Sequence, residues 1–130
     1  MWFVPLVFVT VMAGGGALGM AQVPVPFAEQ GILASVLVLG VMIAAAVRLP
    51  MVWSALIVGL FALFHGYAHG AEMPATAAGL SYGFGFVTAT AALHLCGIGF
   101  GLLAKRFGTE TMIRYAGGGI IACGIILCVS

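Results

Sequence analysis

Charged residues and prolines interrupt an otherwise apolar chain at four places and leave five apolar runs of 15 to 25 residues each. About 20 helical residues cross a hydrocarbon core of ~30 Å. Backbone groups must pair within lipid, and the short alternation of barrel strands is absent, so the runs are expected to be helices. The pattern predicts an all-α, polytopic transmembrane helix bundle, a single integral membrane domain over residues 1–130. Its five spans are 2–21, 31–47, 51–68, 80–104 and 115–129.

The basic residues set the expected orientation of this bundle. Arg48 lies in the link after the second run, and Lys105, Arg106 and Arg114 lie around the link after the fourth. These two links share one side of the membrane, and the positive-inside rule makes that side cytoplasmic. The N-terminus is therefore expected in the cytoplasm and the C-terminus outside.

Composition excludes a water-soluble fold. Apolar residues make up 64% of the 130 residues and charged residues 5%, too few to cover a globular surface. A net charge of +1 carries no signal for nucleic acid. Cys96, Cys123 and Cys128 lie in apolar runs, where they are expected to be small core residues and not a disulfide framework.

The 20 glycines include pairs separated by four positions, which allow helix backbones to approach closely. Backbone exposed to a permeating ion is the alternative interpretation. The pairs are Gly15 with Gly19, Gly66 with Gly70, Gly79 with Gly83, and Gly97 with Gly101.

The segment from Phe64 to Pro74 holds the most informative chemistry. His65 and His69 are separated by four positions and Glu72 follows three later, so a continuous helix would place all three on one face. Two imidazoles and a carboxylate suit nickel, cobalt or zinc. A solvated helix end, with Glu72 an ordinary loop carboxylate, is the alternative.

His94 lies in the middle of the fourth run. It is expected to be a metal ligand along an ion path or a proton acceptor, unless it only forms a hydrogen bond to a neighbouring helix. Thr88 and Thr90 are candidates for hydrogen bonds between helices. The chain has no nucleotide-binding GxxxxGK[ST] string, no HExxH and no Ser-His-Asp arrangement, so an enzyme is not expected.

Residues 61–74, which contain His-Gly-Tyr-Ala-His-Gly-Ala-Glu, resemble the signature of the HupE/UreJ family. Residues 14–19, 37–40, 48–50 and 82–86, the last leading to His94, add to the resemblance. It implies a small membrane protein of hydrogenase or urease gene clusters that acts as a permease for nickel or cobalt. We expect it in the bacterial inner membrane, where the outward C-terminus indicated by the basic residues is periplasmic.

The family normally opens with a signal peptide and a first span that carries a His-Pro-x-x-Gly-x-Asp-His motif. This chain contains no aspartate and no such motif, so it is expected to correspond to the family's second to sixth spans. The partners expected from the resemblance are a divalent metal ion, the lipid bilayer, and a further copy of the chain or the missing span.

The resulting functional prediction is secondary transport of Ni²⁺ or Co²⁺, with zinc as a further candidate and no permanently bound cofactor. The ion is expected to meet Glu72, His69 and His65, and then His94. Two alternatives remain open. One is a membrane scaffold for metal delivery or an inert fragment. The other is a haem protein with His65 or His69 and His94 as axial ligands.

Overall fold

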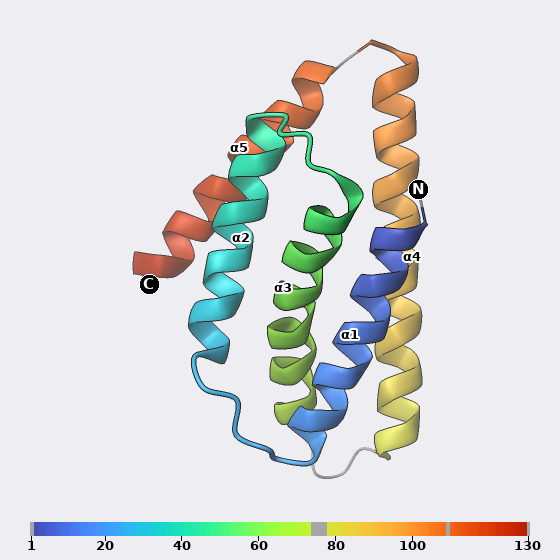
Figure 1. Cartoon of the computed structure of the whole chain (residues 1–130), viewed down its shortest axis with the longest axis vertical. Coiled ribbons are helices and arrows are strands. Elements are labelled where there is room, and N and C mark those ends of the chain that lie inside the picture. The colour runs from blue at the N-terminus through green and yellow to red at the C-terminus, as the bar shows by residue number, and fades with distance from the viewer. Residues whose placement is uncertain (1, 74–77, 109, 130) are drawn as a thin grey trace. The chain divides into compact units, whose positions relative to one another are not determined.

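The computed structural model describes residues 2–73, 78–108 and 110–129, and no strand occurs within them (Figure 1). The helices are α1 (Phe3–Met20), α2 (Ala28–Ala44), α3 (Met51–Ala71), α4 (Gly79–Arg106) and α5 (Glu110–Val129). The all-helical fold class predicted from the apolar runs is therefore confirmed, and each helix corresponds to one run. The prediction of a single membrane domain stays a prediction.

Four of these helices are long and apolar enough to cross a membrane: α1, α3, α4, and α5 from Thr111 onward. Helix α2 has 17 residues, and at 1.5 Å per residue it is about 26 Å long, at the lower limit for a span. It begins and ends three residues before the predicted run. It ends early because Ala46 adopts a φ of 51° and the Val47 amide donates to the Met42 carbonyl at 2.9 Å, a turn that closes the helix.

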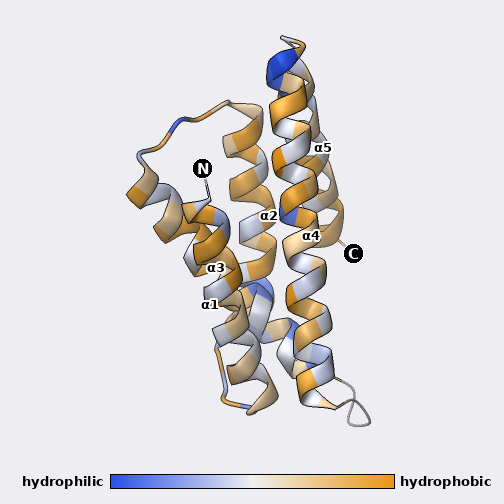
Figure 2. Cartoon of the chain, turned by 90° about the vertical axis from the view of Figure 1, so that its right-hand side faces the viewer, coloured by the Kyte–Doolittle hydropathy of each residue, from blue (hydrophilic) through white to orange (hydrophobic). Residues whose placement is uncertain are grey.

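Apolar residues dominate all five helices, as the hydropathy colouring in Figure 2 shows, and many large apolar side chains are exposed. Leu80 is 92% exposed, Phe84 78% and Leu93 72%. Surfaces of this kind are unfavourable in water and favourable against hydrocarbon chains. The arrangement is that of a multi-pass membrane protein.

Contacts divide the chain into two compact units, which we name by their chemistry. The histidine unit comprises Met1–Gly31 and Leu49–His94, and the basic unit comprises Ile32–Arg48 and Leu95–Ser130. All three histidines lie in the first unit and all four Lys and Arg residues lie in the second.

Helices α1 and α3 pack closely within the histidine unit. A Cβ atom at Gly66 would collide with the backbone of Met12, and one at Gly70 with the backbone of Gly16. Gly15 and Gly19 likewise face backbone atoms of α3. Close packing is thus confirmed for the first two glycine pairs.

The glycines of α4 do not pack in this way. Across the described part of the chain, no atom comes within 4 Å of a Cβ built at Gly83, Gly97 or Gly101. A Cβ at Gly79 would reach only the sulfur of Met20, at 3.9 Å. The packing predicted for these two pairs is therefore not observed.

Helices α2 and α5 approach each other in the basic unit, where Gly117 faces the backbone of Ala44. The Arg114 Nε donates to the Ala44 carbonyl at 2.9 Å. The cysteines are free, as predicted, but all three are exposed. Their assignment to the core was wrong because an apolar run does not distinguish a lipid-facing side chain from a buried one.

Candidate metal site

Helix α3 brings His65 and His69 together. Both lie on one face because four residues span about one helical turn. Their ring centroids are 4.9 Å apart and the rings are inclined by 67°. Both side chains are partly buried within an apolar helix, so the expected pairing of two imidazoles is observed.

Aromatic rings continue from this pair in both directions within the histidine unit. The Phe8 ring of α1 lies 6.3 Å from His65 and 4.8 Å from His94. On the other side, the Phe86 ring of α4 lies 4.9 Å from His69. Tyr82 stacks on Phe86 at 6.4 Å and 12°. A row of rings drawn from α1, α3 and α4 therefore links the three histidines, with Phe8 between His94 and the pair.

A hydrogen bond within α4 orients His94. Its Nδ1 lies 2.9 Å from the Thr90 carbonyl, and a carbonyl only accepts. Nδ1 therefore carries the proton, and Nε2 of a neutral His94 keeps its lone pair. The partner belongs to the same helix, not to a neighbouring helix.

The two threonines of α4 behave differently. Thr90 is buried, and its hydroxyl donates to the sulfur of Met12 in α1 at 3.6 Å. The predicted bond between helices is thus confirmed for Thr90. It is wrong for Thr88, whose hydroxyl donates to the Phe84 carbonyl of its own helix at 2.8 Å.

Tyr82 ties α4 to the end of α3. Its hydroxyl donates to the His69 carbonyl at 2.9 Å. The last four carbonyls of a helix lack the regular intrahelical partner. In α3 the Ala68 carbonyl accepts from the Glu72 amide and the Gly70 carbonyl from Met73, while the His69 carbonyl accepts from Tyr82. Tyr82 therefore caps the turn that carries His69.

Glu72 lies just beyond the last residue of α3, with φ −86° and ψ 2°, and is exposed. The described residues contain no group of three or more His, Cys, Asp or Glu side chains placed to hold a metal ion. The structure thus pairs His65 with His69 but does not gather them with Glu72 and His94. Pro74 lies outside the described residues, and the four-residue site stays a prediction.

A cavity of about 140 Å³ adjoins this region of the histidine unit. Met20, Gly70, Tyr82 and Phe86 contribute to its wall. The Phe86 ring lies beside His69, and the Tyr82 hydroxyl donates to the His69 carbonyl. One water occupies about 30 Å³ of liquid, so the cavity has room for a few waters. Its wall is mostly apolar and does not include His69.

Residues 1–127 match the model of the family described as HupE / UreJ protein. The chain belongs to the HupE/UreJ family. Protein HupE of Rhizobium leguminosarum bv. viciae is 42% identical over 130 residues, which cover 98% of this chain and 67% of that protein. No solved structure matches the chain significantly.

The match confirms the family expected from the signature. HupE/UreJ proteins are accessory membrane proteins of hydrogenase and urease systems and do not form an enzyme family. Sequence reasoning did not identify Phe8, Tyr82 and Phe86 as neighbours of the histidines. The spacing of Tyr82 and Phe86, four apart, is a signal for a shared helix face. Nothing in the sequence connects Phe8 to His94.

Proposed function

We propose that this chain carries nickel or cobalt ions across the bacterial inner membrane for the maturation of a metalloenzyme. The observation that supports the proposal most is the imidazole pair of His65 and His69, 4.9 Å apart in an apolar helix. Ionisable groups at membrane depth are costly and usually functional. Imidazole is a suitable ligand for Ni²⁺, Co²⁺ and Zn²⁺.

The proposed path begins at the exposed carboxylate of Glu72, which attracts the cation. His69 and His65 then bind it, and His94 receives it through Nε2 on the far side of the Phe8 ring. No nucleotide site occurs in the sequence, so the membrane potential or an ion gradient supplies the driving force. A divalent cation gains about 4.6 kcal/mol per 100 mV when it crosses the full field, from ~2.3 per charge.

The proposed orientation places the basic links of Arg48 and of Lys105 to Arg114 in the cytoplasm. The N-terminus is then cytoplasmic and the C-terminus periplasmic. In a variant without the native cysteines, a single cysteine at Ala28 should react with an impermeant thiol reagent added outside intact cells. Reaction there only after the cells are opened contradicts the orientation.

Metal uptake by intact cells tests the transport proposal. Cells that lack their own nickel transporter should accumulate nickel when they produce the parent chain. Glu72→Gln keeps the shape of the side chain and removes its charge, so accumulation should fall strongly at equal membrane abundance. Glu110→Gln makes the same change between the fourth and fifth apolar runs, far in sequence from the histidines. It is the matched control and should retain uptake.

Two other outcomes identify the alternatives. Nickel binding by the purified chain without accumulation in cells indicates a metal-delivery scaffold. A coloured preparation with a Soret band indicates a haem protein with two histidine ligands. Uptake by Glu72→Gln equal to that of the parent removes the carboxylate from the path.

A further inference from the structure

The basic unit contains every Lys and Arg of the chain, and its helix ends bring them to one end of that unit. Arg48 follows the C-terminus of α2, and Lys105 and Arg106 form the last turn of α4. Arg114 lies near the start of α5, and its bond to the Ala44 carbonyl joins that start to the end of α2. Four cations therefore accompany a single acidic residue, Glu110, in this unit.

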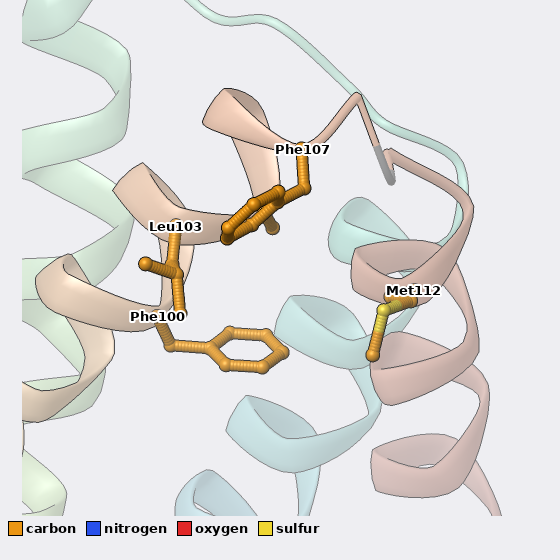
Figure 3. Close-up of a pocket in the computed structure, with 5 residues that line it drawn as sticks. Phe100, Leu103, Phe107 and Met112 are labelled. Atoms are coloured by element: carbon orange, nitrogen blue, oxygen red, sulfur yellow. The ribbon is translucent and has the colours of Figure 1, made fainter.

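An apolar pocket of about 280 Å³ opens at the same end of the basic unit (Figure 3). Its lining comes from the end of α4 and the start of α5: Phe100, Leu103, Ala104, Phe107 and Met112. Phe107 is 69% exposed and Met112 53%, so the pocket is accessible from outside.

The basic pair lies along α4 between two residues of the pocket wall, Ala104 and Phe107. The Phe107 amide donates to the Leu103 carbonyl at 3.1 Å, which extends the helical winding past Arg106. Gly108 then adopts a φ of 65°, where only glycine is unstrained, and the chain turns toward α5. Lys105 and Arg106 are exposed, and the hydrophilic end of α4 stands out against the apolar helices in Figure 2.

A ligand for this place needs both a hydrocarbon part and a negative charge. Hydrocarbon fits a pocket without charged lining residues, whereas a soluble anion gains nothing there. Long basic side chains lay their stems on apolar surface and extend their charges to the headgroup level. Basic pockets between membrane helices bind anionic headgroups. The cavity of the histidine unit offers no such combination, because that unit contains no Lys or Arg.

We propose that this pocket is a binding site for an anionic phospholipid. One acyl chain lies against Phe100, Leu103 and Met112, and the phosphate lies at the headgroup level beside Lys105 and Arg106. The charge complementarity selects an anionic lipid over a zwitterionic lipid with the same acyl chains.

Native mass spectrometry of the detergent-purified chain tests this proposal. Phosphatidylglycerol should remain bound in preference to phosphatidylcholine of identical acyl chains. Lys105→Gln and Arg106→Gln should each lower the phosphatidylglycerol affinity about five-fold, because a basic residue near the surface contributes ~1 kcal/mol. Neither change should alter phosphatidylcholine binding. Arg48→Gln removes the same charge from the link after α2, which is distant in sequence from every wall residue, and should have a smaller effect.

A second variant tests whether the pocket holds the acyl chain of the lipid. Met112→Trp fills the pocket and should lower the affinity for both lipids, with the helix content by circular dichroism unchanged. Equal binding of the two lipids by the parent chain overturns the proposal. Undiminished selectivity in the Lys105→Gln, Arg106→Gln double variant overturns it as well.

Discussion

The histidine unit and the basic unit divide the chemistry of the chain between them. The first contains His65, His69 and His94 with Glu29 and Glu72, and no Lys or Arg. The second contains four basic residues and Glu110, and no histidine. The proposed metal path uses residues of the histidine unit alone, and the proposed lipid site uses residues of the basic unit alone. The histidines and the basic residues therefore occupy separate parts of one short chain.

The glycines of α1 and α3 also differ from those of α4 in how they pack. Gly66 and Gly70 each directly follow a histidine of the family signature, and each lies against the backbone of α1. The glycines of the signature therefore allow α1 to lie against α3, beside the two histidines that we propose as metal ligands. The open glycines of α4, such as Gly97, have no such role within the described residues.

The largest effect is expected when the close contact between α1 and α3 is broken. Gly66→Ala places a Cβ against the Met12 backbone, and such overpacking costs about 1–3 kcal/mol. The helices must separate, so the amount of folded protein in the membrane should fall. Fluorescence-detected size exclusion of the detergent extract measures this amount. Gly97→Ala adds the same methyl group in open space and should match the parent; equal loss in both variants contradicts the packing account.

A smaller effect is expected from the cap on α3. Tyr82→Phe keeps the stacking on Phe86 and removes only the hydroxyl that donates to the His69 carbonyl. One hydrogen bond contributes about 0.5–1.5 kcal/mol, so nickel affinity should weaken about two- to ten-fold while folded yield stays level. Tyr115→Phe removes a hydroxyl from the exposed Tyr115 of the basic unit and serves as the control. An unchanged nickel affinity in Tyr82→Phe would show that the hydrogen bond from Tyr82 to the His69 carbonyl does not contribute to nickel binding.

The helical fold follows directly from the sequence, because apolar runs of span length have one regular solution in lipid. The pairing of His65 with His69 follows equally, since a spacing of four residues fixes a shared helix face. These features depend on local spacing, which the sequence contains. The end of α2 was harder to predict, because the turn at Ala46 uses a non-glycine residue with positive φ.

Contacts between distant segments could not be predicted in this way. The Phe8 ring beside His94, the Thr90 bond to Met12 and the Tyr82 cap all depend on which helices pack together. Hydropathy does not specify helix neighbours, because lipid is as apolar as the helix surfaces. The same limit explains the wrong assignment of the cysteines to the core.

Nickel titration of the detergent-purified chain tests the central claim, that His65 and His69 form the metal site, most directly. We predict binding at about pH 7.5 and weaker binding at about pH 5.5, because a protonated imidazole cannot bind a metal ion. Each single His→Ala change should weaken binding by about ten-fold or more, and the double change should add less than the sum of the two. Nickel affinities equal to the parent's in His65→Ala, His69→Ala and the double variant at both pH values would contradict the account.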